Sequence, residues 1–429
     1  MIRRLVVPPF EALEPLLPRR GGADRATRDA VSAILEAVLQ RGDEAVREYA
    51  RQFDGVDLAP DQWALDPGIW QAALERIPAP LRTALNLAVD RVRVYHEHQR
   101  DPGFHLTEAD GSLVGVKLSP LDRVGLYIPG GKASYPSSVV MNAVPALVAG
   151  VQEIIAVVPP QGVTDLVLSA CALSGVTRIF RIGGAQAVAA LAYGTATVPR
   201  VDKIVGPGNR WVAEAKRQVA GDVGIDMIAG PTEVLIIADG TARPDWIAAD
   251  LIAQAEHDEE ATSWCVTTDA PLADALPDAL EAALARAPRE AIARTALDRH
   301  GAIVLVPSMR EAIEVTNRRA PEHVEIMAQG AERIASSIRH AGAIFLGDDT
   351  PEPVGDYLAG PSHVLPTSGT ARYASPLGVY DFVKRTSVIR YTRARLTADA
   401  APLIALAEAE GLYGHAQAVR VRDTPPGYP

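Results

Sequence analysis

The sequence has little cysteine and no long apolar run. Its two cysteines, Cys171 and Cys265, cannot build a disulfide framework and nearly exclude a cysteine-based zinc cluster. No stretch of about 18 apolar residues occurs, so no transmembrane helix is expected. The apolar run at the N-terminus is too short for a signal peptide and meets Pro8 and Pro9. We therefore expect a cytoplasmic protein.

A compact block of basic residues is also missing. The chain carries 42 Lys and Arg against 53 Asp and Glu, which gives a net charge of −11. This balance argues against a nucleic-acid binder and against a protein that binds anionic membranes. The GxGxxG fingerprint of many dinucleotide-binding folds is absent as well. The 429 residues, 48% of them hydrophobic, suffice for about two to three globular domains.

Hydrophobic periodicity divides the chain. Up to about Arg100 it is helical, with an apolar stripe made by Val31, Ile34, Leu35, Val38 and Leu39. From Asp122, β-branched runs alternate with helical patterns, and strands are expected at 124–128, 153–158, 178–182 and 203–205. A second alternating stretch covers 234–346. The alternation predicts parallel sheets covered by helices. Glycine-rich turns at 130–131, 183–184 and 206–208 are typical of a ligand crevice.

The C-terminal segment looks different. A basic, strand-like run at 381–392 is followed by a short helix at 401–410 and a polar tail. This segment is too small to fold alone, so it is expected to dock elsewhere, for example on a partner subunit.

Two polar pairs are candidates for chemistry. Gln254 and His257 are three residues apart and share a helix face, where they could grip a metal. Taken alone, a solvated polar face is the favoured interpretation. Glu322 and His323 follow the helix-breaking Pro321 and could shuttle protons near neutral pH. A helix start with a favourable glutamate explains that pair equally well.

Three further polar residues are ambiguous when taken singly. Asp356 lies in a loop rich in Gly and Pro, where it could bind a metal or cap a turn. His415 follows a glycine that would end a helix, and taken alone it is best interpreted as a histidine exposed to solvent. Asn209 opens a helix that could hold an anion, or it could close a tight turn. The residues themselves thus indicate an α/β enzyme with a His/Asp/Gln metal site and leave its substrate open.

Taken together, the motifs resemble the histidinol dehydrogenase family. They follow the family's order across nearly the whole chain, at 125–131, 181–187, 205–209, 229–233, 254–257, 320–323, 355–360, 363–367 and 410–412, with His415 last. The resemblance implies two Rossmann-like, aldehyde-dehydrogenase-like parallel-sheet domains with a helical N-terminal segment and a small C-terminal tail domain. The implied limits are an arm at 1–23, a discontinuous catalytic and metal-binding domain at 24–127 and 235–378, an NAD-side domain at 128–234, and a tail at 379–429.

The resemblance also implies roles for single residues. One Zn²⁺ per subunit would be held by Gln254, His257, Asp356 and His415. The acid–base pair would be Glu322 and His323, and the NAD contacts would be Tyr127, Gln186 and Asn209. The substrate would lie near Thr232, His363 and Glu410, as well as near His323 and the metal ligands. The family position of Thr232 is often serine, so the substrate pocket would gain one methyl group.

The implied activity is the oxidation of L-histidinol to L-histidine by two NAD, through a bound aldehyde, in the last steps of histidine biosynthesis. His323 would accept the alcohol proton, and Glu322 would activate water. The enzyme would be a homodimer in which Glu410 and His415 reach the partner subunit's site. Two alternatives stay open: a paralogue that oxidises another polar alcohol, such as a sulfonated diol, and a non-catalytic NAD- or metal-binding regulator. The settings of Cys171 and Cys265 resemble core packing rather than a catalytic thiol.

Overall fold

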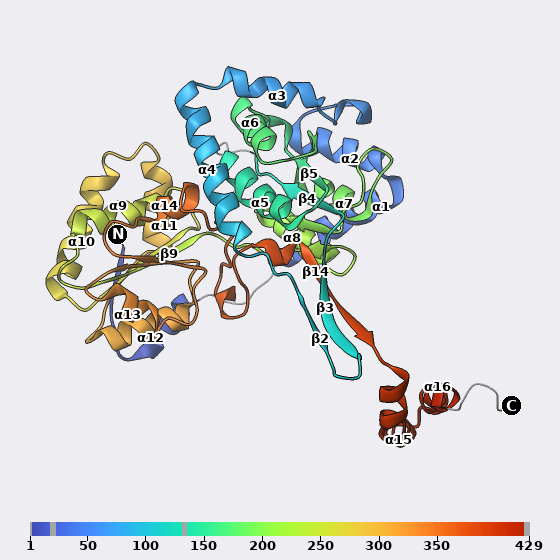
Figure 1. The fold of residues 1–429 in the computed structure, drawn as a ribbon. Helices are drawn as coiled ribbons and strands as arrows, with labels where there is room; N and C mark the ends of the chain where they lie inside the picture. Colours follow the sequence, from blue (N-terminus) through green and yellow to red (C-terminus); the bar gives the residue numbers. More distant parts are fainter. Residues whose placement is uncertain (1, 18–22, 131–134, 424–429) are drawn as a thin grey trace. The chain divides into compact units, whose positions relative to one another are not determined.

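The computed structural model describes residues 2–17, 23–130 and 135–423. The chain divides into two compact units, one formed by residues 1–99 with 121–382 and the other by residues 100–120 with 383–429. Each is described by itself below, with the labels of Figure 1. None of the described helices is long and apolar enough to cross a membrane.

A six-stranded parallel sheet forms one half of the first unit. Its strands run in the order β1-β11-β10-β9-β12-β13. Their bounds are β1 (Arg3–Val6), β9 (Glu233–Ala238), β10 (Thr262–Thr267), β11 (Ala302–Leu305), β12 (His323–Met327) and β13 (Ala343–Leu346). The strand β1 comes from the predicted N-terminal arm and pairs with β11.

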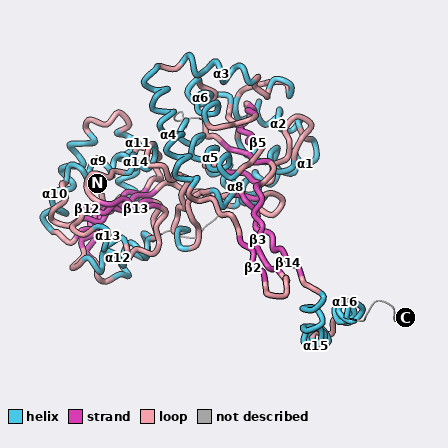
Figure 2. The backbone as a smooth tube through the Cα atoms, viewed as in Figure 1, coloured by secondary structure: helices cyan, strands magenta, loops and turns pink. Residues whose placement is uncertain are grey.

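Helices cover both faces of this sheet (Figure 2). One face packs on α9 (Pro244–Ala255), α10 (Ala270–Leu284) and α11 (Glu290–His300), and the other on α12 (Met309–Arg319) and α13 (Ala331–Ala335). Within β9, Val234 and Ile236 face the first group, whereas Leu235 and Ile237 face the second. Burial on both faces explains why the strands are unbroken apolar runs in the sequence.

A five-stranded parallel sheet forms the other half, in the order β6-β5-β4-β7-β8. Its strands are β4 (Arg123–Tyr127), β5 (Glu153–Val157), β6 (Arg178–Phe180), β7 (Lys203–Val205) and β8 (Gly224–Ile225). The flanking helices are α5 (Pro136–Ala149), α6 (Asp165–Leu173), α7 (Gly184–Tyr193) and α8 (Arg210–Val219). From the central strand β4, the chain adds β5 and β6 on one side of the sheet and then β7 and β8 on the other. The order in which strands are added therefore reverses between β4 and β7. Ligands of open α/β sheets bind at such a point.

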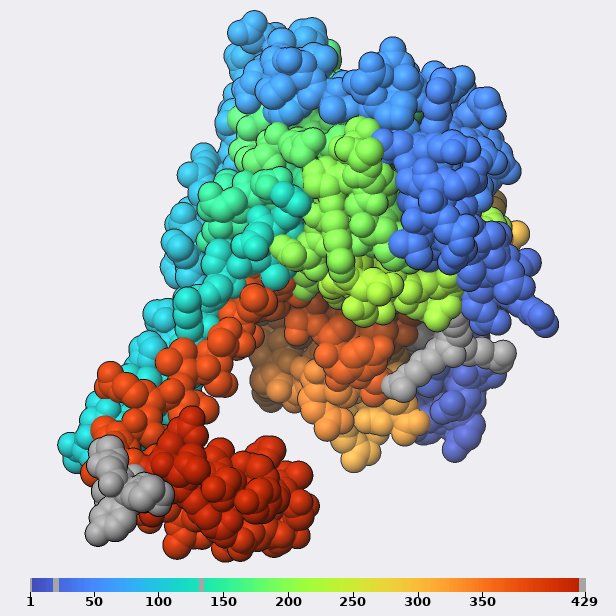
Figure 3. All heavy atoms as spheres, turned by 90° about the vertical axis from the view of Figure 1, so that its right-hand side faces the viewer, coloured from blue at the N-terminus to red at the C-terminus, as the bar shows by residue number. Residues whose placement is uncertain are grey.

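The N-terminal helices pack on the five-stranded half. They are α1 (Arg25–Arg41), α2 (Asp43–Tyr49), α3 (Pro67–Arg76) and α4 (Ala79–Glu97). Helix α1 contacts α7 and α8, α3 contacts α6, and α4 contacts α5. Figure 3 shows α1 in blue against this green region. The predicted limits, which group residues 24–127 with 235–378, stay a prediction, because contact clustering places both halves in one unit. A local apolar stripe does not specify its partner, and the stripe of α1 is buried among α7 and α8.

The predicted stripe of α1 is correct except at one position. Val31, Ile34, Leu35 and Val38 are buried, whereas Leu39 is 57% exposed. The first unit is completed by α14 (Glu352–Tyr357) and by short helical turns, which are η1 (Phe10–Leu16), η2 (Ala50–Asp54), η3 (Pro60–Gln62), η4 (Pro160–Gly162), η5 (Thr370–Arg372) and η6 (Val379–Asp381).

The second unit is an antiparallel sheet followed by two helices. The sheet has the order β14-β3-β2, from β2 (Phe104–Thr107), β3 (Leu113–Pro120) and β14 (Val383–Arg390). Helix α15 (Arg393–Ala409) begins earlier than predicted, and α16 (Tyr413–Asp423) follows it. Among the residues described for these two helices, only Ala400 and Ala416 are buried. This unit therefore has almost no core of its own.

Candidate active site and metal centre

The predicted catalytic pair lies at the amino edge of the six-stranded sheet. β9 and β12 are paired there, so Thr232, just before β9, and Glu322, just before β12, are neighbours. The Thr232 hydroxyl donates to Glu322 Oε2 at 2.5 Å, and the Glu233 backbone N–H donates to the same oxygen at 2.9 Å. Burial raises the pKa of Glu322 to about 8, although both hydrogen bonds favour the carboxylate. Glu322 therefore gains and loses a proton close to physiological pH.

His323 is the first residue of β12 and is buried. Its Nδ1 lies 3.0 Å from the backbone carbonyl oxygen of Glu233. A carbonyl oxygen only accepts, so Nδ1 carries the proton and Nε2 is the basic atom of the neutral ring. Burial lowers the pKa of His323, which keeps the imidazole neutral and able to accept a proton. The Phe345 ring lies 5.9 Å from the His323 ring, centroid to centroid, and packs beside it.

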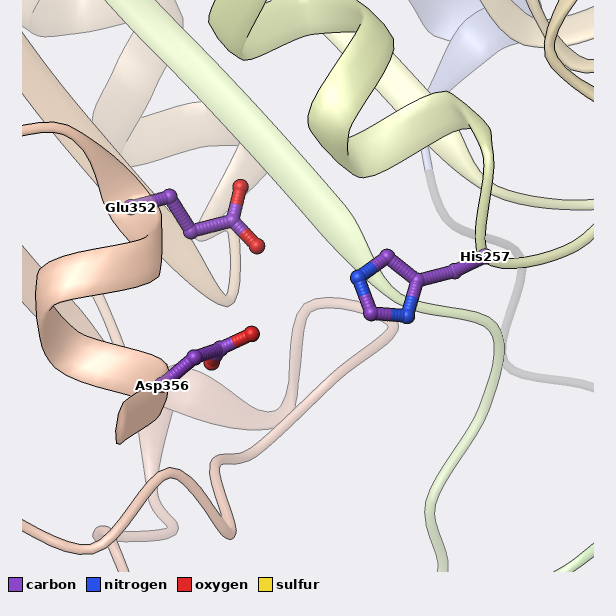
Figure 4. A group of neighbouring side chains, drawn as sticks. All are labelled: His257, Glu352 and Asp356. Atoms are coloured by element: carbon purple, nitrogen blue, oxygen red, sulfur yellow. The ribbon is translucent and has the colours of Figure 1, made fainter. Parts of the chain in front are cut away.

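Three further side chains form a cluster suited to a metal. His257 follows α9, and Glu352 and Asp356 lie four residues apart on one face of α14. One ligand atom from each lies within 4.8 Å of the others. Figure 4 shows both carboxylates directed toward the His257 ring. Glu352 was absent from the predicted metal set, although its i, i+4 spacing from Asp356 is visible in the sequence.

Gln254 brings an amide oxygen to the same cluster. It is fully buried in α9, and its Nε2 donates to Thr232 Oγ1 at 2.8 Å. In this orientation its oxygen lies 3.1 Å from both carboxylate oxygens of Glu352. Three acceptors so close repel one another unless a cation lies among them, the amide turns over to donate, or Glu352, whose pKa is raised by burial, is protonated and donates. Imidazole nitrogen with carboxylate and amide oxygens is a donor set that suits Zn²⁺.

His363 lies against Asp356, with 3.5 Å between Nδ1 and Oδ1. Burial opposes the charged form of Asp356, but the hydrogen bond from His363 and the neighbouring imidazoles lower its pKa to about 2. Asp356 is thus anionic at neutral pH, as a metal ligand must be. Of the residues predicted for catalysis, metal and substrate, the structure brings together Thr232, Gln254, His257, Glu322, His323, Asp356 and His363.

The predicted cofactor contacts lie at the carboxyl edge of the five-stranded sheet. Tyr127 ends β4, and its hydroxyl accepts a hydrogen bond from the Gly184 N–H at 3.0 Å. Asn209 caps α8, accepting from the Trp211 N–H at 3.0 Å. β4 and β7 flank the reversal of strand order, so Tyr127 and Asn209 lie on its two sides. Both residues therefore lie where open α/β sheets bind their ligands.

Gln186 is the third predicted cofactor contact and lies in the first turn of α7. It is 0% exposed, and neither atom of its amide has a hydrogen-bond partner among the residues that the structure describes. A buried amide without partners is costly, and a bound polar ligand would supply them.

Two predicted site residues belong to the second unit. Glu410 follows α15, His415 lies in α16, and both are exposed. Their predicted roles toward a partner subunit stay predictions.

Neither cysteine lies in surroundings that would activate its thiol as a nucleophile. Cys171 and Cys265 are fully buried, and burial raises the pKa of each thiol to about 12. A thiol in such a setting does not ionise near neutral pH, so neither cysteine can attack an aldehyde as a thiolate.

Comparisons with known proteins agree on one family. A family model described as histidinol dehydrogenase matches residues 17–423. The histidinol dehydrogenase of Aromatoleum aromaticum is 53% identical over 427 residues, with 98% of each chain covered. That of Dechloromonas aromatica is 52% identical, covering 96% of this chain and 95% of its own.

Solved structures point the same way. Histidinol dehydrogenase from Elizabethkingia anophelis superposes with a TM-score of 0.93 at 32% identity, covering 98% of each chain. An acetylating aldehyde dehydrogenase from Geobacillus thermoglucosidasius shares the fold alone, with a TM-score of 0.50 at 14% identity, covering 86% of this chain and 94% of its own. These matches confirm the predicted α/β fold and give no support to a paralogue that oxidises another polar alcohol.

Proposed function

Because the chain belongs to the histidinol dehydrogenase family, we propose that it is a zinc-dependent enzyme that oxidises L-histidinol to L-histidine with two NAD. Membership makes it an oxidoreductase of histidine biosynthesis. The observation that supports the detailed proposal best is the Glu322–His323 pair, whose shifted pKa values suit proton transfer, beside a cluster of metal-ligating side chains.

Zinc would be held by Gln254, His257 and Asp356, with His415 supplied by a second copy of the chain. Glu352 lies within reach of the same ion. When bound, zinc would supply a fixed positive charge that anchors the substrate and a Lewis acid near its reacting end. Separate anchoring of substrate allows the first NADH to leave while the aldehyde stays in place.

NAD would bind at the carboxyl edge of the five-stranded sheet and accept a hydride in each oxidation. Tyr127 and Asn209 would contact it from the two sides of the strand-order reversal. The buried amide of Gln186 would gain the hydrogen bonds that it lacks among the described residues.

The protein's own groups would manage the protons. His323 holds its Nδ1 proton against the Glu233 carbonyl, so Nε2 would accept the proton of the alcohol, return it to the carbonyl oxygen as water adds to the aldehyde, and then accept the proton of the hydrate. Glu322, with a pKa of about 8, takes a proton from the water that attacks the aldehyde. Thr232 orients that carboxylate through its hydroxyl. The burial of both catalytic side chains keeps other water away from the reactive aldehyde.

A homodimer completes the proposal. The second unit exposes large apolar side chains, including Leu406 at 66% and Tyr413 at 72%. Covering them on another copy would bury apolar surface and bring Glu410 and His415 to that copy's site. Glu410 would face the cationic end of the substrate, beside Thr232 and His363. A cytoplasmic location, without nucleic-acid or membrane partners, belongs to the same proposal.

The test is histidinol-dependent reduction of NAD by purified protein, before and after chelation. We expect activity to be lost with the chelator and restored by added zinc. The variant His323→Asn should lose at least about a hundredfold in kcat. The matched control His98→Asn, at an exposed histidine, should keep its rate. A folded, zinc-bound protein that forms no NADH with histidinol would refute the proposal.

A further inference from the structure

The five-stranded sheet has the strand order of a dinucleotide-binding fold, but one expected side chain is missing at its carboxyl edge. In such folds an acidic residue near the end of the second strand hydrogen-bonds the ribose hydroxyls of NAD. The second strand here is β5, and the residues that follow it are Val158, Pro159, Pro160 and Gln161. None of them is acidic, so a ribose bound at this edge needs an acceptor from another part of the chain.

Asp54 reaches this edge from the N-terminal helices. It ends η2, a single π-helical turn of a kind found often at functional sites. Gly55 follows with φ 67°, a left-handed conformation that favours glycine and turns the chain away. The Gln161 Nε2 donates to the backbone oxygen of Asp54 at 2.6 Å. Asp54 is thereby attached to the loop after β5, where the acidic residue is missing.

One oxygen of the Asp54 carboxylate has no hydrogen-bond donor among the described residues. This atom, Oδ2, is also shielded from solvent. Burial raises the pKa of Asp54, and no described cation lies close enough to lower it. A shielded carboxylate oxygen of this kind is costly unless a ligand brings hydroxyl or N–H groups to it.

Asp54 also acts electrostatically on Tyr127, one of the predicted cofactor contacts. Burial raises the pKa of Tyr127 to about 12, and the negative charge of Asp54 contributes to the rise. The Tyr127 hydroxyl is in turn bonded to the N–H of Gly184, in the glycine-rich turn after β6. Asp54 is thus hydrogen-bonded to the loop after β5 and lies within electrostatic range of Tyr127 at the end of β4, and both strands end at the carboxyl edge where open α/β sheets bind ligands.

We propose that Asp54 binds the 2′ and 3′ hydroxyls of the adenosine ribose of NAD and excludes NADP. The proposal rests on the proposed function, because it takes NAD as the cofactor. Both ribose hydroxyls can donate, and a carboxylate is an acceptor that can bind donors of this kind. The 2′-phosphate of NADP is anionic and has no 2′ hydroxyl to donate, so it would meet the Asp54 carboxylate with repulsion.

The experiment is calorimetric binding of NAD to the full chain without histidinol, with steady-state kinetics beside it. Asp54→Asn keeps the shape of the side chain and removes its charge. We expect the Kd and KM for NAD to rise about ten- to a hundredfold, with kcat at saturating NAD and the KM for histidinol unchanged. The preference for NAD over NADP should fall. Asp61→Asn, which alters an exposed carboxylate in the next helical turn, should leave every value unchanged.

A second measurement uses the unmodified protein, so that misfolding of a variant cannot explain its result. NAD lacking the adenosine 2′ hydroxyl should bind about tenfold more weakly than NAD itself, and Asp54→Asn should bind the two alike. Equal binding of the two dinucleotides by the unmodified protein would overturn the role of Asp54. Unchanged NAD affinity in Asp54→Asn would do the same. A complete lack of NAD binding by the unmodified protein would instead overturn the proposed function.

Discussion

Replacing Thr232 with valine removes one hydroxyl from the centre of the proposed active site and keeps the shape of the side chain. That hydroxyl donates to Glu322 at 2.5 Å and accepts from Gln254 at 2.8 Å. The hydrogen bond to Glu322 favours the charged carboxylate. Loss of this bond therefore raises the pKa of Glu322, which already lies at about 8. A hydrogen bond to a charged group contributes about 1.5–3 kcal/mol, which corresponds to about one to two pH units.

The assay is the pH dependence of kcat/KM for histidinol. In the proposed mechanism Glu322 acts as a base, so the rate should increase as pH rises through its pKa and the carboxylate forms. In Thr232→Val this rise should move about one to two pH units to higher pH, which lowers the rate at neutral pH about ten- to a hundredfold. Thr232→Ser keeps the hydroxyl and should retain the profile of the unmodified protein. A valine variant with an unshifted profile would refute the link between Thr232 and the ionisation of Glu322.

Three other outcomes follow from the structure. Lys216→Met should destabilise the fold by about 3–5 kcal/mol in denaturant unfolding, because the buried Asp226 loses its ion-pair partner. The double variant Lys216→Met with Asp226→Asn should lose less stability than Lys216→Met alone. An equal loss of stability in the two variants would contradict this reason. Glu352→Gln should weaken zinc binding about ten- to a hundredfold in competition with a chelator, and unchanged affinity would remove Glu352 from the metal's surroundings. Changing Cys171 and Cys265 together to alanine should leave kcat within about twofold in a folded protein, whereas loss of turnover would restore a thiol mechanism.

The strands could be predicted because burial on both sheet faces makes them continuous apolar runs. The expected strand at 153–158 is β5 at Glu153–Val157, and the expected strand at 203–205 is β7 at Lys203–Val205. The hairpin of β2 and β3 was not predicted, since its exposed strands lack that signal. The start of α15 was missed as well, because its first turns are charged and carry no apolar stripe.

The candidate active site could likewise be predicted only in part from the sequence. Glu322 and His323 could be singled out because adjacent acid and imidazole are visible in the sequence, but their burial and shifted pKa values depend on the pairing of β9 with β12. Glu352 escaped notice, since nothing local shows that α14 turns it toward His257. The proposed role of Asp54 depends on a contact between segments more than a hundred residues apart in the chain. Tertiary neighbours of this kind leave no periodic trace in a single sequence.

The central claim is that one site carries out both oxidations while the aldehyde stays bound. The measurement that tests it most directly is the number of NADH formed per histidinol, with zinc-loaded protein, excess NAD and limiting histidinol. We expect two NADH for each histidinol consumed and histidine as the product. One NADH per histidinol, with aldehyde released to solution, would contradict this claim.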